Sequence, residues 1–150
     1  MNIYALVIGV AIAVIIIWHF RRRKLEQAQL PYPILLASFP LYYFAFAIYA
    51  SDHVALYKEI GIGIPFIALA YFATRSNRIL SSYLVALGCI THAAYDVFHD
   101  SFFINPGTPD WWLEFCGSID LILACYLIYF AVKSPNKAFK QDTKQHAPPT

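Results

Sequence analysis

The chain alternates between five long apolar stretches and short polar connections. The stretches cover residues 3–20, 33–50, 55–74, 79–99 and 111–132. Each is close to the ~20 residues that a helix needs to cross the hydrocarbon core of a bilayer. Because the stretches are continuously apolar rather than alternating, they predict helices and not the strands of a membrane barrel. The pattern therefore predicts an all-α bundle of five transmembrane helices with antiparallel neighbours.

The composition also favours a membrane protein. Hydrophobic residues make up 59% of the chain and charged residues only 13%, whereas a soluble domain is about half apolar and about a quarter charged. So few charges would not cover a soluble core of this size, and the same figures exclude a disordered chain and a disulfide-rich secreted fold. The expected partner is the lipid bilayer, and no nucleic-acid partner is expected.

The basic residues predict the orientation. The first stretch is expected to stay as an anchor, because its positive charges follow the apolar run, whereas those of a signal peptide precede it. Of the 11 Lys and Arg residues, only Lys58 falls on the opposite side from the others. The positive-inside rule then puts the N-terminus outside and the C-terminus in the cytoplasm. Residues 1–133 are expected to form the transmembrane domain, and residues 134–150 a disordered cytoplasmic tail.

The fourth stretch carries a polar stripe. His92, Asp96 and His99 are spaced i, i+4 and i+7, which puts them within about 60° of one another on one helix face. Asp120 and Glu59 lie at overlapping depths in the fifth and third stretches. An ionised acid facing lipid costs at least ~2.5 kcal/mol. The stripe is therefore predicted to face the bundle interior, with Glu59 and Asp120 as partners.

These residue types suit a divalent metal such as zinc, manganese or iron. We predict His92, Asp96 and His99 as metal ligands, and Glu59 and Asp120 as catalytic carboxylates. The same groups would also suit a metal-free acid–base site or a proton relay. A structural hydrogen-bonded cluster is a further alternative, and His99 also fits a solvated helix end or a partner of a ligand.

The three cysteines lie inside apolar stretches and form no C-x-x-C pair. Cys89, Cys116 and Cys125 are predicted to be free thiols buried within the lipid bilayer, with metal-ligand thiolates as the alternative. The leading functional hypothesis is a metal-dependent membrane hydrolase that acts on a lipid-like substrate. The alternatives are an ion or proton transport component, an accessory membrane subunit without catalysis, and a purely structural membrane partner.

Three segments carry a resemblance to a known family. They are Glu59-Ile60-Gly61, the segment from Leu87 to His99 and the segment from Cys116 to Ala124. Over residues 57–130 the chain resembles the small bacterial membrane proteins grouped as domain of unknown function family 6010, with their pattern H-x-x-[WY]-D-x-x-H and an aspartate in the next helix. The family usually has His where this chain has Asp100. The resemblance implies a multi-helix protein of the bacterial inner membrane and implies no activity.

Overall fold

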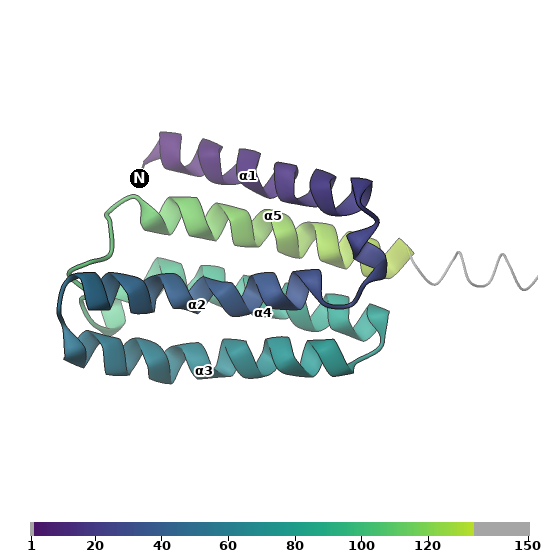
Figure 1. Ribbon diagram of the computed structural model, residues 1–150. Helices are drawn as coiled ribbons and strands as arrows, with labels where there is room; N and C mark the ends of the chain where they lie inside the picture. The colour runs from purple at the N-terminus through teal and green to yellow at the C-terminus, as the bar shows by residue number, and fades with distance from the viewer. Residues whose placement is uncertain (1, 134–150) are drawn as a thin grey trace, which may run out of the picture.

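The computed structural model describes residues 2–133, so the predicted disordered tail lies outside the described residues. This part of the chain forms five α-helices and one short 3-10 helix and contains no strand (Figure 1). In chain order the elements are α1 (Ile3–Arg22), η1 (Leu25–Gln27), α2 (Pro31–Tyr49), α3 (His53–Arg75), α4 (Arg78–Phe102) and α5 (Trp112–Lys133). The all-α prediction is confirmed, with a helix in each predicted apolar stretch.

Four of the five α-helices are long and apolar enough to cross a membrane, which indicates a membrane protein. They are α1, α2, α3 and α5. The fourth, α4, has 25 residues, which is more than enough to span the hydrocarbon core. It is less apolar than the others because it carries His92, Asp96 and His99, all of which are buried inside the bundle.

Short polar side chains fix the starts of three helices. The side-chain oxygens of Asn2, Asp52 and Asn77 accept hydrogen bonds from backbone N–H groups of α1, α3 and α4 at 3.1, 2.9 and 3.0 Å. Such caps satisfy donors that have no partner within the helix. Asp52 is therefore the residue that caps the start of α3.

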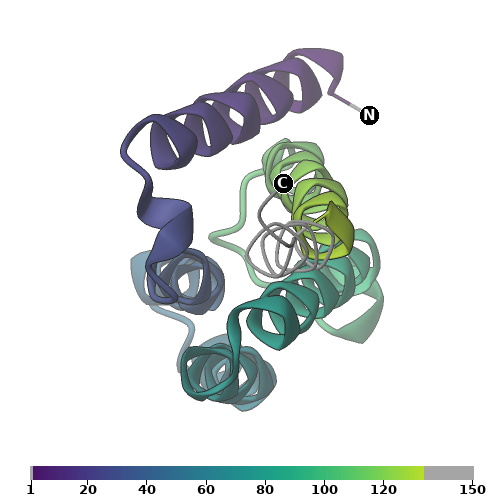
Figure 2. The ribbon, with the colours of Figure 1, turned by 90° about the vertical axis from the view of Figure 1, so that its right-hand side faces the viewer.

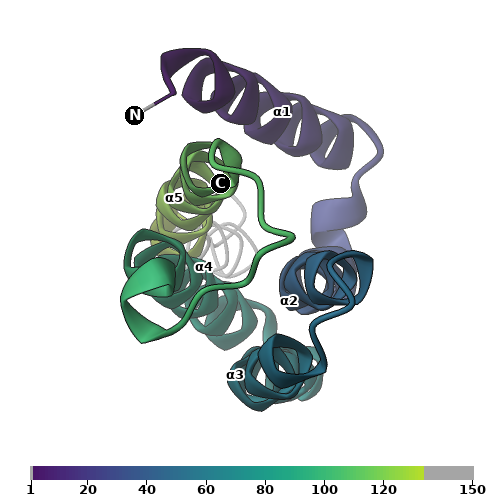
Figure 3. The ribbon, with the colours of Figure 1, turned by 90° about the vertical axis from the view of Figure 1, so that its left-hand side faces the viewer.

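The helix α4 lies between α5 and α3 and connects the two sides of the bundle. It packs against α5, α3 and α2, while α1 packs mainly against the outer side of α5 (Figures 2 and 3). The apolar core joins these helices through large side chains that are almost completely inaccessible, namely Leu36, Val85, Leu123 and Leu127. This arrangement makes the α4–α5 contact the framework for the polar residues described below.

The two ends of the bundle differ in charge. The α1–α2 and α3–α4 connections and the end of α5 lie at one end, and the α2–α3 and α4–α5 connections lie at the other (Figure 1). Within residues 2–133, every Lys and Arg except Lys58 lies at or near the first end, here called the basic end. The antiparallel order of the helices thus produces the segregation of charge that the sequence suggested.

Candidate metal centre

The polar stripe of α4 faces α5 in the interior of the bundle. His92 and Asp120 are 0% exposed and Asp96 is 2% exposed. The Nδ1 atom of His92 lies 2.9 Å from Oδ2 of Asp120 and 3.6 Å from Oδ2 of Asp96. The prediction that these three side chains converge is therefore confirmed. None of the three faces lipid.

A fourth side chain, Cys116, completes the group. His92, Asp96, Cys116 and Asp120 each offer one potential ligand atom, and these atoms all lie within 4.8 Å of one another. Cys116 and Asp120 are four residues apart on α5, just as His92 and Asp96 are on α4, so two facing i, i+4 pairs form the group. From the sequence, metal ligation by cysteine was only the alternative, and Cys116 was not among the predicted site residues. The four-residue spacing between Cys116 and Asp120 could have indicated from the sequence that both side chains lie on the same face of the helix.

Three buried polar atoms in this group have no hydrogen-bond partner: Nε2 of His92, Oδ2 of Asp96 and Oδ1 of Asp120. A buried polar atom without a partner costs about 1–3 kcal/mol, so native structures contain few of them. Here three occur together on residues that also bring two carboxylates into one site. A bound cation would supply partners for these atoms and offset the negative charge.

Aromatic side chains enclose the imidazole of His92. Ring centroids of Phe66, Phe39 and Tyr43 lie 5.0, 5.5 and 6.2 Å from that of His92. The Tyr43 hydroxyl also donates a hydrogen bond of 2.7 Å to Oδ1 of Asp96. Side chains from α2 and α3 thus exclude water from the group and orient one of its carboxylates.

A second polar cluster, made of Glu59, Tyr95, His99 and Asn105, lies beside the first. The Tyr95 hydroxyl donates to Oε2 of Glu59 at 2.7 Å. Oε1 of Glu59 accepts from the Asn105 amide at 2.9 Å and lies 2.9 Å from Nε2 of His99. Both carboxylate oxygens of Glu59 are therefore engaged, and the cluster joins α3, α4 and the α4–α5 connection.

The structure does not bring His99 and Glu59, a predicted ligand and a predicted catalytic residue, into the four-residue group. His99 follows His92 by seven residues, so the two lie about 10 Å apart along the helix axis at 1.5 Å per residue. Nε2 of His99 instead lies 2.9 Å from Oε1 of Glu59, and neither residue belongs to the group whose ligand atoms lie within 4.8 Å of one another. The i+7 spacing aligns His99 with the same face but moves it two turns away.

The second cluster has contacts at both of its sides. His99 stacks on Tyr43, with ring centroids 4.7 Å apart and an interplanar angle of 23°. On the other side, Nδ1 of His99 lies 2.9 Å from Oδ1 of Asp100, whose side chain is 90% exposed. The side chain of Asp100 is thus largely exposed at the end of the cluster. Asn105, in the α4–α5 connection, is buried.

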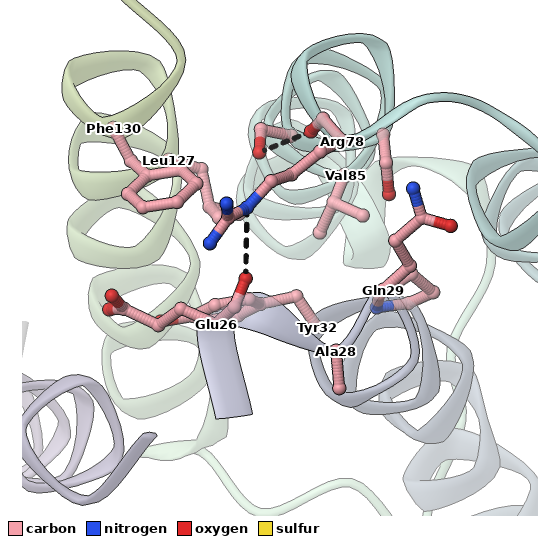
Figure 4. Close-up of a pocket in the computed structure, with 11 residues that line it drawn as sticks. Glu26, Ala28, Gln29, Tyr32, Arg78, Val85, Leu127 and Phe130 are labelled. Carbon is pink, nitrogen blue, oxygen red and sulfur yellow. Dashed lines mark hydrogen bonds between the residues drawn. The ribbon is translucent and has the colours of Figure 1, made fainter. Parts of the chain in front are cut away.

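A small cavity near the basic end holds no comparable group (Figure 4). Its volume is about 20 Å³, which is room for about one water molecule. The Arg78 side chain crosses it, donates to the backbone oxygen of Glu26 at 3.2 Å and lies over the ring of Phe130. These contacts tie the η1 segment to α4 and α5, so the cavity belongs to the packing of the helix ends.

No family model matches the chain, and no curated protein or solved structure matches it either. The resemblance to domain of unknown function family 6010 thus gains no support from the family models. The proposals that follow depend on the geometry of the described residues.

Proposed function

We propose that this protein binds a divalent metal ion between α4 and α5 and uses it to hydrolyse a lipid-like substrate. The observation that carries the proposal is the convergence of four potential ligand atoms, from His92, Asp96, Cys116 and Asp120, within 4.8 Å of one another. Three of these residues also bear buried polar atoms that lack a partner. A hydrogen-bonded cluster that served only the fold would be expected to satisfy its own atoms.

The charge of the group also supports a cation. Asp96 and Asp120 are both inaccessible to solvent and share one neutral or singly charged imidazole. Two ionised carboxylates buried with so little compensation would be costly, because charges in a low-dielectric interior need partners. A divalent ion removes this imbalance. Imidazole, thiolate and carboxylate together are ligand types that zinc accepts, and zinc is therefore the metal we propose.

The division of roles follows from the contacts of the two carboxylates. Catalytic zinc sites use three protein ligands and keep one position for water or substrate. We assign His92, Asp96 and Cys116 as the ligands. Asp120, which already contacts His92 and has one oxygen without a partner, is the group we assign to orient the imidazole and to accept a proton. The bound metal would polarise a carbonyl or phosphoryl oxygen and activate water.

The proposal extends to the arrangement in the membrane. We propose that α4 crosses the bilayer together with the four apolar helices, because its polar side chains are buried within the bundle. The N-terminus then lies outside and the C-terminus in the cytoplasm, since the basic end carries nearly all positive charges of residues 2–133. In this orientation the metal centre lies nearer the outer face.

Metal analysis of the purified protein tests the central claim. Wild-type protein in detergent should contain about one zinc per chain, since four groups converge on one point, or should take up cobalt with a visible absorption spectrum. His92→Gln and Asp96→Asn should remain folded and lose the metal. A wild-type protein that binds neither zinc nor cobalt, and that melts at the same temperature with and without metal, would contradict the proposal, because a ligand of the native state raises its stability.

A metal-free acid–base relay is the second candidate. A hydrogen-bonded series runs from the exposed Asp100 through His99 and Glu59 to Tyr95, with separations of 2.7 to 2.9 Å. Such a series could carry protons between the outer face and the interior. It does not continue toward the basic end, where Leu123 and Leu127 fill the core. Proton movement through the protein that persists after complete removal of metal would favour the relay over the metal-dependent hydrolase.

A further inference from the structure

An apolar groove runs along the outside of the bundle between α1, α4 and α5. Its volume is about 630 Å³. The walls include Leu6 and Val10 of α1, Val97 of α4 and Leu121 of α5. Val97 and Leu121 are 62% and 52% exposed, and α1 and α5 are both apolar enough to cross a membrane. The groove therefore opens toward lipid rather than toward water.

The two polar side chains that line the groove, Glu114 and Ser118, already have hydrogen-bond partners. Oε1 of Glu114 accepts a hydrogen bond of 2.9 Å from the backbone N–H of Asn2. The Ser118 hydroxyl already lies within hydrogen-bond distance of two backbone carbonyls, those of Phe115 at 2.9 Å and Leu6 at 3.2 Å. An alkyl chain would therefore leave no buried hydrogen-bonding group of Ser118 unsatisfied.

Gly117 lies where the groove meets the metal centre. It is buried, yet a side-chain Cβ at this position would approach only Oδ2 of Asp96, at an ordinary contact distance of 3.9 Å. Four other glycines differ, because a Cβ there would come within 2.5 Å of a neighbouring atom: Gly9, Gly63, Gly88 and Gly107. Close approach of a neighbouring chain segment accounts for those four glycines and does not account for Gly117.

The space over Gly117 adjoins a carboxylate oxygen that has no hydrogen-bond partner. Oδ2 of Asp96 is buried without a hydrogen bond. Gly117 comes three residues before Asp120 and one after Cys116, so it sits on the side of α5 between the metal centre and the groove. Ala93, which also lines the groove, follows His92 on α4. Two small residues thus separate the lipid-facing groove from the group of four ligands.

We infer that the groove admits the alkyl chain of a membrane lipid and that the oxygen-bearing head of this lipid reaches the metal centre over Gly117. The inference rests on the proposed function and names its substrate class: a lipid whose carbonyl, carboxyl or phosphoryl oxygen is next to an alkyl chain. The apolar walls bind the chain by the hydrophobic effect. The bare backbone at Gly117 gives the head access to Asp96.

Photolabelling tests the groove without requiring a metal. Metal-free protein in lipid vesicles is irradiated with a diazirine derivative of lauric acid, and the labelled residues are mapped by mass spectrometry. Labels should concentrate on Val97 and Leu121. They should fall severalfold in Gly117→Leu and stay unchanged in Gly61→Leu, because Gly61 is exposed with nothing within 4 Å of its Cβ position. Equal labelling of all three proteins would overturn the groove assignment.

A chelating probe tests the connection to the metal centre. Lauroyl hydroxamate joins a metal-binding head to an alkyl chain. It should change the spectrum of the cobalt protein at a concentration at least about tenfold lower than acetohydroxamate requires, because burying a few methylene groups raises affinity by at least that factor. The Gly117→Leu variant should still bind cobalt but should no longer bind the long-chain hydroxamate more tightly than the short one. Gly117→Ala, which fits the available space, guards against misfolding of the larger variant and should keep an intermediate preference.

The outcomes separate the two proposals. Wild-type protein that binds no cobalt but is photolabelled along the groove would defeat the metal-dependent hydrolase and leave the lipid groove standing. Cobalt binding without any chain-length preference, or with the same preference in Gly117→Leu, would overturn the access route and leave the metal centre intact.

Discussion

Nδ1 of His92 and Oδ2 of Asp120 lie 2.9 Å apart at the centre of the bundle, although the two residues are 28 positions apart in the chain. The contact joins the polar stripe of α4 to Asp120, the buried acidic residue in the middle of α5. It fixes the rotation of each helix about its axis, because turning either helix would expose a charge to lipid. It also brings Cys116 and Asp96 to the same place.

The first prediction separates the ligands from the orienting carboxylate. His92→Gln and Asp96→Asn should abolish stoichiometric zinc binding, because each removes a proposed ligand. Asp120→Asn should weaken zinc affinity by only about 10–100-fold, the usual effect of losing a partner of a metal-bound histidine. Competition with a chelator of known affinity measures the difference. Asp100→Asn is the matched control, because that side chain is 90% exposed. Equal loss in all three buried variants would make Asp120 a ligand.

The second prediction concerns the thiols. Cys116→Ser should remove the sulfur-to-metal absorption band of the cobalt protein and lower its affinity, whereas Cys125→Ser should change neither, because Cys125 is exposed on the outside of the bundle. Cys89 is buried beside Asp120 and provides a second comparison. A charge-transfer band that persists in Cys116→Ser and disappears in Cys89→Ser would transfer the ligand role to Cys89.

The third prediction is the direction of the pH dependence. Carboxylate, thiolate and imidazole must all be deprotonated to bind a metal, so binding releases protons. Zinc affinity should therefore fall as the pH is lowered, and the slope should be less steep in Cys116→Ser, which has one proton fewer to release. Isothermal titration in two buffers with different ionisation enthalpies counts the protons. Affinity that does not change with pH would be incompatible with this ligand set.

The fourth prediction assigns the second cluster to stability. Tyr95→Phe removes the hydroxyl that donates to Oε2 of Glu59 and leaves a buried carboxylate oxygen without its donor, which costs about 1–3 kcal/mol. Tyr57→Phe, at a site that is 74% exposed, should change the free energy of unfolding by less than about 0.5 kcal/mol. Unfolding in detergent measures both. Loss of zinc from a folded Tyr95→Phe protein would show that the second cluster also serves the metal centre.

The fifth prediction is the topology. In a Cys125→Ser background, a membrane-impermeant maleimide added to intact cells should label Asp110→Cys and should label Lys133→Cys only after lysis. Asp110 is exposed in the α4–α5 connection, and Lys133 ends α5 at the basic end. Cys89 and Cys116 are buried and should not react. The reverse labelling pattern would refute the proposed orientation.

Much of the fold follows from the order of apolar and polar residues. Runs of about 20 apolar residues can satisfy their backbone hydrogen bonds in a membrane only as helices, and short connections force neighbours to alternate in direction. The helical spacing of His92 and Asp96 likewise follows from the 3.6-residue turn, and the cost of exposing charge to lipid points these side chains inward. For these reasons His92, Asp96 and Asp120 were all foreseeable as one buried group.

Only the tertiary structure shows which of these residues are in contact with one another. Periodicity gives the face of a helix but not the height at which a neighbouring helix meets it. His99 therefore lies on the same face as His92 but pairs with Glu59 instead of joining the group around His92. The register of α5 against α4 brought in Cys116, and the seating of the α4–α5 connection brought in Asn105. That register depends on side-chain packing along the whole α4–α5 contact, which no local pattern in the sequence encodes.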